Sequence, residues 1–163
     1  MSKTLLDYKR VLIVDDESDV LDTLEALLPM CDVVKASTFD EAKDLLEVQY
    51  FDIAILDIMG VDGYKLLDIA KVREVIPVML TAHALSVDDT MKSFKEGAAC
   101  YIPKEEMSDI TTFLNDILEA KEMNKSVWWR WLDRFSSYYD RKFGPNWQDK
   151  DKGFWEGLRN LDV

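Results

Sequence analysis

Acidic side chains stand at the ends of apolar runs in this chain, where together they could hold a divalent cation. Asp15 and Asp16 close the run "RVLIVDD", and Asp57 closes the run "YFDIAILD". Two carboxylates about 4 Å apart repel each other by about 4 kcal/mol at an effective dielectric constant of about 20. Mg²⁺ prefers carboxylate oxygens and would offset that repulsion. These acids therefore predict a magnesium site at the ends of the two runs.

Two further apolar runs end on polar residues that would lie near these acids. Thr81 ends "IPVMLT", and Lys104 follows "ACYIP". A hydroxyl can donate a hydrogen bond, and an ammonium group supplies positive charge. Taken singly, each such residue has an ordinary structural explanation, such as a helix cap, a turn or a solvated side chain. Their occurrence together at the ends of separate runs favours a functional site.

The runs that must position these residues are short and rich in Val, Ile and Leu, which is typical of parallel strands covered on both faces. The expected strands are residues 10–16, 31–37, 50–57, 76–82 and 99–105. Apolar residues at helical spacing follow each of them. The expected helices are residues 17–28, 39–48, 64–72, 87–96 and 107–120.

Strands that alternate with helices over short connections predict an α/β fold with a doubly wound, five-stranded parallel sheet in the flavodoxin-like order 2-1-3-4-5. In such sheets ligands bind beyond the carboxyl ends of the strands. The acids, the threonine and the lysine are therefore expected to meet at one end of the sheet.

Charge and tryptophan content both change near residue 122. Residues 1–120 carry 11 basic and 25 acidic side chains, whereas residues 121–163 carry 9 and 7. All five tryptophans lie after residue 127. We therefore divide the chain into a domain at residues 1–122 and a helical, aromatic-rich C-terminal extension at residues 123–163.

The strong negative charge of the first domain would repel the phosphate backbone of a nucleic acid. This repulsion argues against direct nucleic-acid binding by that domain.

The extension contains an aromatic stripe at helical spacing within residues 123–143. The stripe consists of Trp128, Trp131, Leu132, Phe135, Tyr138 and Tyr139. Gly144-Pro145 is expected to end this helix, and a shorter helix is expected within residues 146–161 with Asn146 as its N-cap.

Three interpretations of the stripe remain open. It could pack on the first domain, or it could form an interaction surface for a second copy, a kinase or a target through Trp128, Trp131, Phe135 and Tyr138. Binding at a membrane surface is the weakest alternative, because the polar face mixes both charge signs. The extension is too short for a winged-helix domain and lacks the basic stripe of a DNA-binding protein. We therefore expect it to act through contacts with other proteins.

The four motifs "LIVDDE", "AILDIM", "VMLTA" and "YIPKE" together resemble the receiver domain of two-component response regulators, over residues 8 to about 122. The resemblance implies a CheY-like fold in which Asp57 accepts a phosphoryl group from the phosphohistidine of a histidine kinase. It also implies that Asp16 and Asp57 bind Mg²⁺ directly, that the carbonyl of Met59 is a third ligand, and that Asp15 acts largely through water.

The same resemblance assigns roles around the phosphoryl group. Thr81, Ala82 and Lys104 would hold its oxygens, and Tyr101 would be an aromatic switch that enters the space that the Thr81 hydroxyl leaves. Such a change would be read on the surface of the fourth and fifth helices. Met59 and His83 occupy the positions that tune the lifetime of the phosphoryl group. Because both side chains are large and could hinder the attacking water, we expect the phosphoryl group on Asp57 to be hydrolysed slowly, over minutes or longer.

The sequence departs from the receiver pattern in two places. The loop after Asp57 is about two residues shorter than usual and lacks the proline of the family. Lys104 is followed by Glu105 instead of proline, while Pro103 precedes it. The first departure leaves the Met59 carbonyl as the least secure of the expected metal ligands, and the second suggests that Lys104 is held differently.

We therefore expect a response regulator receiver protein that switches protein–protein interactions in a phosphorelay and is not an enzyme. The expected partners are a sensor histidine kinase or phosphotransfer protein and a downstream protein target, with a homodimer left open. No apolar run approaches the ~18 residues of a membrane helix, and the N-terminus lacks a signal-peptide core, so a cytoplasmic location is expected. The alternatives are a phosphorylation-independent scaffold and a haloacid-dehalogenase-like phosphohydrolase, although Met59 stands where those enzymes have a second acid.

Overall fold

Five parallel strands form the sheet of the computed structural model, which describes residues 5–82, 87–123 and 128–159. The strands are β1 (Arg10–Val14), β2 (Asp32–Ala36), β3 (Ile53–Asp57), β4 (Ile76–Thr81) and β5 (Cys100–Pro103). Their order is β2-β1-β3-β4-β5, and every neighbouring pair is parallel. The predicted doubly wound sheet and its strand order are confirmed.

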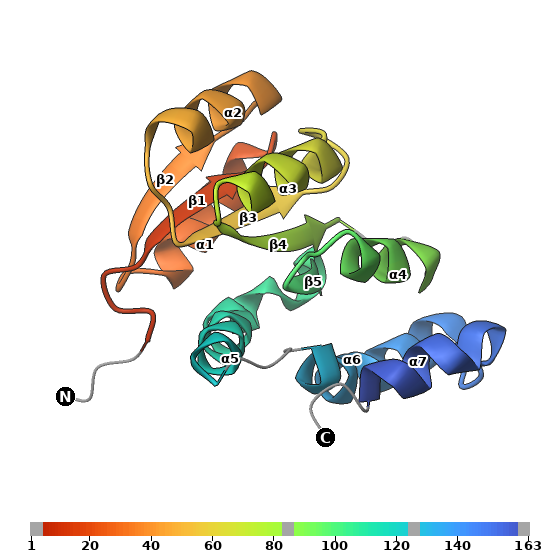
Figure 1. Ribbon diagram of the computed structural model, residues 1–163. Coiled ribbons are helices and arrows are strands. Elements are labelled where there is room, and N and C mark those ends of the chain that lie inside the picture. Colours follow the sequence, from red (N-terminus) through yellow and green to blue (C-terminus); the bar gives the residue numbers. More distant parts are fainter. Residues whose placement is uncertain (1–4, 83–86, 124–127, 160–163) are drawn as a thin grey trace.

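Helices cover both faces of this sheet. They are α1 (Ser18–Leu27), α2 (Phe39–Val48), α3 (Gly63–Val72), α4 (Val87–Lys95) and α5 (Ile110–Glu122). Helices α1 and α5 lie on one face, and α2 and α3 lie on the other (Figure 1). The central strands are therefore buried on both sides, which explains why their sequences read as continuous apolar runs instead of alternating ones.

The extension forms two helices, α6 (Trp128–Phe143) and α7 (Lys152–Arg159), which lie beside α4 and α5 near the edge strand β5 (Figure 1). The aromatic stripe lies on α6 at the predicted helical spacing, and all of its residues except the partly buried Tyr138 are buried. The prediction that Asn146 caps the second helix is wrong. A short 3₁₀ turn (Asp149–Asp151) comes first, and the Asp151 carboxylate accepts a hydrogen bond from the Phe154 N–H at 3.1 Å, so the N-terminal acid of α7 is Asp151.

The buried face of α6 packs against the first domain. The indole N–H of Trp128 donates to the Ala98 carbonyl at 2.8 Å, and the Tyr139 hydroxyl lies 2.6 Å from the Thr90 hydroxyl. Arg134 on the same helix pairs with Asp116 of α5 at 2.6 Å. Of the three interpretations of the stripe, the structure shows the first, because aromatic side chains of α6 are buried against the first domain. Within the described ranges, no helix is long and apolar enough to cross a membrane.

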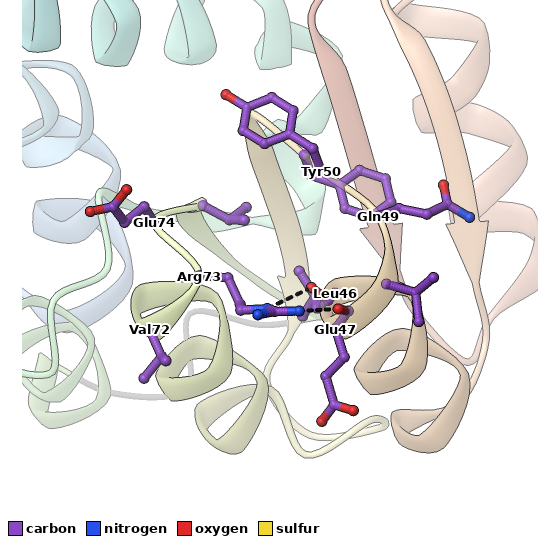
Figure 2. A pocket seen from close by; sticks show the side chains of 10 residues that line it. Leu46, Glu47, Gln49, Tyr50, Val72, Arg73 and Glu74 are labelled. Carbon is purple, nitrogen blue, oxygen red and sulfur yellow. Dashed lines mark hydrogen bonds between the residues drawn. The ribbon is translucent and has the colours of Figure 1, made fainter.

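A shallow pocket lies at the opposite end of the sheet from the expected site (Figure 2). Its walls are residues 46–51 and 72–75, which precede β3 and β4. Arg73 spans it and donates hydrogen bonds to the carbonyls of Leu46 and Glu47 at the end of α2. These bonds satisfy terminal carbonyls of that helix, so Arg73 joins α3 to α2 as part of the scaffold.

Candidate functional site

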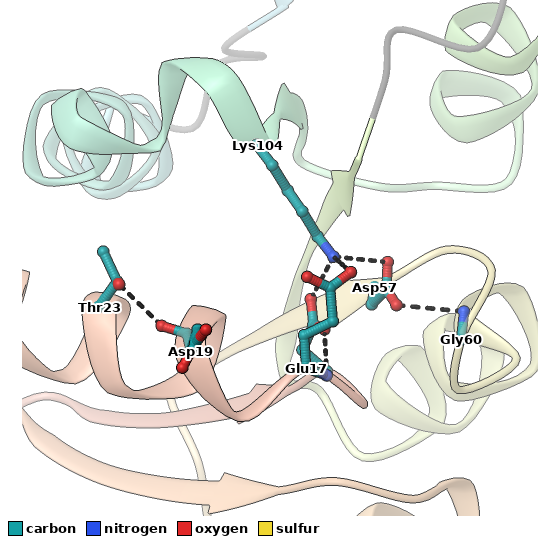
Figure 3. Close-up of polar contacts among 7 residues, drawn as sticks. Glu17, Asp19, Thr23, Asp57, Gly60 and Lys104 are labelled. Atoms are coloured by element: carbon teal, nitrogen blue, oxygen red, sulfur yellow. Dashed lines mark hydrogen bonds and ion pairs between the residues drawn. The ribbon is translucent and has the colours of Figure 1, made fainter.

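The carboxyl ends of the strands bring the predicted polar residues together. Asp15 follows β1, Asp57 ends β3, Thr81 ends β4 and Lys104 follows β5. Figure 3 shows the Lys104 side chain reaching from the turn after β5 toward acids that follow β1 and β3. The sheet topology thus produces the convergence that the sequence predicted.

Lys104 is the cation at the centre of this cluster. Its Nζ lies 2.7 Å from Asp15 Oδ2, 3.5 Å from Glu17 Oε1 and 3.6 Å from Asp57 Oδ1. The side chain is only 10% exposed, so these ion pairs are screened far less than surface pairs are. A single lysine therefore links acids that come from two separate strands.

Two of the acids are buried, and the loss of hydration destabilises their ionised forms. Asp15 is 0% exposed and Asp57 is 4% exposed. Burial raises the pKa of Asp57, and the charge of Asp15 raises it further, while Lys104 and the Gly60 N–H act in the opposite direction. Burial likewise raises the pKa of Asp15 in spite of its bond to Lys104. A further cation would therefore relieve charge that Lys104 alone does not balance.

The acids that follow β1 can supply oxygen ligands to such a cation. One oxygen each from Asp15, Asp16 and Glu17 lies within 4.8 Å of the others. Glu17 was not among the predicted ligands, and its carboxylate joins Asp15 and Asp16 in this cluster. This donor set consists only of carboxylate oxygens and fits the chemistry of Mg²⁺. The ligand assignments of Asp15, Asp16, Asp57 and the Met59 carbonyl all stay predictions.

The short loop after β3 is closed by two backbone hydrogen bonds. The Gly60 N–H donates to Asp57 Oδ2 at 3.1 Å, and the Gly63 N–H donates to the Ile58 carbonyl at 3.0 Å. Asp62 adopts a left-handed conformation, with φ of 56°, between these glycines. The loop therefore uses this tight turn where the family has a longer path through proline, and it leaves the Met59 side chain 75% exposed.

Both glycines of this loop are required by close approaches. A Cβ atom at Gly60 would lie 2.3 Å from Asp16 Oδ1, and one at Gly63 would lie 2.3 Å from the Asp57 carbonyl oxygen. The first contact involves a side chain that can move, whereas the second involves backbone that cannot move cheaply. The two glycines that follow Asp57 in the sequence thus allow the loop to fold tightly against the site.

Replacing Gly63 by Ala is expected to lower the free energy of unfolding by about 1–3 kcal/mol, because the new methyl group would press on the Asp57 backbone. Urea denaturation followed by circular dichroism measures this loss. Gly157→Ala is the matched control, since a Cβ there would meet no heavy atom within 4 Å. Equal stability of the Gly63→Ala variant and the wild type would contradict the loop geometry.

The remaining predicted residues lie around the same end of the sheet. Thr81 is 1% exposed and Tyr101 is 0% exposed, and they stand on the neighbouring strands β4 and β5. Ala82 follows β4 at the surface, while His83 lies outside the described residues. The switch between Thr81 and Tyr101 and the tuning roles of Met59 and His83 stay predictions.

Comparison with known proteins agrees with this geometry. The family model described as "Response regulator receiver domain" matches residues 11–115. A solved receiver domain protein (CheY-like) from Methanospirillum hungatei has 30% sequence identity and a TM-score of 0.65, and the match covers 72% of this chain and 99% of that one. A receiver domain protein from Clostridium thermocellum has 26% identity and a TM-score of 0.61, with 71% and 98% covered.

Curated relatives are longer than this chain. The heme response regulator HssR of Staphylococcus aureus is 29% identical over 120 residues, which are 71% of this chain and 54% of the relative. The probable transcriptional regulator ycf27 of Guillardia theta is 40% identical over 101 residues, which are 59% and 39% of the two chains. The chain thus spans about half of the first relative and less of the second. Because ycf27 is named as a transcriptional regulator, the absence of nucleic-acid contact stays a prediction here.

The match to the family model covers well over half of the chain and includes Asp15, Asp57, Thr81 and Lys104. The solved receiver domains share its sheet. The chain therefore belongs to the response regulator receiver domain family.

Proposed function

We propose that this chain accepts a phosphoryl group on Asp57 from the phosphohistidine of a histidine kinase or phosphotransfer protein. The observation that carries the proposal is the position of Lys104, whose Nζ lies 2.7 Å from Asp15 and 3.6 Å from Asp57. A buried acid beside a lysine and further acids suits in-line phosphoryl transfer, because that reaction needs positioning and charge neutralisation more than covalent help.

In this reaction a carboxylate oxygen of Asp57 forms a bond to phosphorus while the P–N bond of the phosphohistidine breaks. The electron pair of that bond stays on the imidazole nitrogen, which takes up a proton on leaving. The Gly60 N–H holds Asp57 Oδ2, and Lys104 faces Oδ1, so the nucleophile is oriented before the donor arrives.

The residues around Asp57 then hold the transferred group. Lys104 stabilises the negative charge on its oxygens, and the Thr81 hydroxyl donates a hydrogen bond to one of them. Mg²⁺, when bound by the carboxylates that follow β1, supplies further positive charge to the same oxygens. The product is an acyl phosphate on Asp57, and the protein's catalytic contribution is limited to forming and hydrolysing this bond.

The response reaches the surface through β5. Movement of the Thr81 hydroxyl toward the phosphoryl group would free space for Tyr101. Tyr101 lies beneath α6, where the Trp131 indole donates a hydrogen bond to the Tyr101 carbonyl at 2.6 Å. A shift of Tyr101 would therefore alter how the extension packs. We infer that phosphorylation is read by a downstream protein through the surface that α4, α5 and the extension form together.

Isothermal titration with beryllofluoride and Mg²⁺, which mimic the phosphoryl group, tests the proposal. The wild type is expected to bind one equivalent, and Asp57→Ala is expected to show no binding. Binding that persists in Asp57→Ala would assign the ligand to another site. Absence of binding by the folded wild type would refute the phosphoacceptor role and favour the phosphorylation-independent scaffold.

The phosphoryl group is expected to survive for minutes or longer once formed, because Met59 and His83 are large at positions that control access of water. The lifetime is measured by intact-mass spectrometry after removal of the phosphoryl donor. Met59→Gly should shorten it, because a smaller residue opens one side of the site. A wild-type half-life of seconds would contradict this prediction.

A further inference from the structure

Helix α6 of the extension runs alongside the chain segment that leads to Lys104. The Trp128 and Trp131 indoles donate to the carbonyls of Ala98 and Tyr101 at 2.8 and 2.6 Å. The Tyr138 hydroxyl, farther along α6, donates to the carboxylate of Glu105. The contacts therefore follow one direction along both segments and end at the residue next to Lys104.

Glu105 is held by two groups of α6. Besides the Tyr138 hydroxyl, Lys142 Nζ lies 3.5 Å from the same Oε1 atom of Glu105. Lys104 and Glu105 share a peptide bond but face opposite directions, since the Lys104 side chain is 10% exposed and that of Glu105 is 51% exposed. Helix α6 thus holds Glu105 on the solvent side, while Lys104 reaches into the site.

The turn that carries Lys104 has little packing of its own to fix it. Residues Lys104–Asp109 form a 3₁₀ helix in which none of the six residues is buried, and Pro103 provides no side-chain cap. Its position therefore comes from the partly buried Met107, which packs on the core, and from polar contacts. The Lys104 ion pairs hold it on the inner side, and the Glu105 contacts with α6 hold it on the outer side.

We propose that Tyr138 and Lys142 are positioning residues for Lys104, acting through Glu105, and that the extension is therefore part of the machinery of the phosphoryl site. The inference rests on the proposed function, because it concerns how the lysine of that site is held. Electrostatic stabilisation depends steeply on the placement of the charge. By linkage, ligand at the site and the contacts of Tyr138 and Lys142 with Glu105 stabilise each other.

Tyr138→Phe in the full-length chain tests this inference, because it removes one hydroxyl and keeps the ring that packs on Phe135 and Tyr139. The variant is expected to bind beryllofluoride with Mg²⁺ about fivefold more weakly than the wild type in isothermal titration. Lys142→Met should act in the same direction. Arg134→Met is the matched control, since it breaks the contact of α6 with Asp116 without touching Glu105, and its affinity should equal that of the wild type.

A second titration with Mg²⁺ alone separates positioning from general loosening of the site. Tyr138→Phe should bind Mg²⁺ at least as tightly as the wild type, because a displaced Lys104 competes less for the acids. Unchanged beryllofluoride affinity in Tyr138→Phe would overturn the inference, and so would an equal weakening of both ligands. Failure of the folded wild type to bind beryllofluoride would instead overturn the proposed function, and the inference with it.

Discussion

Replacement of Lys104 by Met is expected to slow phosphorylation of Asp57 by about 10²–10³-fold, which is the usual cost of removing one preorganised charge from a transition state. The reason is geometric. Lys104 Nζ lies within 3.6 Å of Asp57 and is largely shielded from solvent, so water cannot replace its charge without rearrangement. The rate is measured by intact-mass spectrometry with acetyl phosphate as the donor and Mg²⁺ present.

Lys35→Met is the matched control for this variant. Lys35 also pairs with two acids, Asp22 and Glu25, at 3.2 and 2.9 Å, but it lies on β2 away from Asp57. Its loss should leave the rate unchanged. Lys104→Met should also bind Mg²⁺ more tightly than the wild type, because the acids lose a competing cation. A wild-type rate in Lys104→Met would remove the lysine from the mechanism.

Replacement of Trp131 by Ala is expected to lower the free energy of unfolding by about 3–5 kcal/mol, the range for truncating a large buried aromatic side chain. Trp131 is 2% exposed and its ring packs against several others. Those rings are Trp128, Phe135, Tyr139 and Trp155. The variant would also lose the hydrogen bond to the Tyr101 carbonyl, so the extension should detach from β5.

Urea denaturation measures this loss, and two variants help to interpret it. Trp131→Phe keeps an aromatic ring but loses the indole N–H, so its stability should fall between those of the wild type and Trp131→Ala. Tyr50→Ala is the control, because this ring is 66% exposed and surface substitutions usually change stability by less than about 0.5 kcal/mol. Wild-type stability in Trp131→Ala would show that the extension does not pack on the receiver.

The sheet could be predicted from the sequence because its physical causes are local. Strands buried on both faces require continuous apolar runs, and helices between them require apolar residues at three- and four-residue spacing. The strands β3 and β4 accordingly end at Asp57 and Thr81 as the sequence indicated. Once the topology was fixed, the convergence of these residues with Lys104 followed from the geometry of a parallel sheet.

Other features depend on contacts between distant parts of the chain, for which the sequence carries no local signal. The aromatic stripe of α6 predicted a helix, but the same stripe would suit the receiver, a partner or a membrane. The contact of Glu105 with Tyr138 joins residues 33 positions apart. The cap at Asn146 was wrong because the chain first makes a 3₁₀ turn, and tight turns of this kind compete closely with a helix start.

The position of the phosphoryl group after reaction with acetyl phosphate tests the central claim most directly. The protein is digested after the reaction, and the modified residue is located by peptide mass spectrometry. We predict a single phosphoryl group on Asp57 that requires Mg²⁺ and is absent from Asp57→Ala. A phosphoryl group on any other residue, or equal labelling of Asp57 when Mg²⁺ is chelated, would contradict the account.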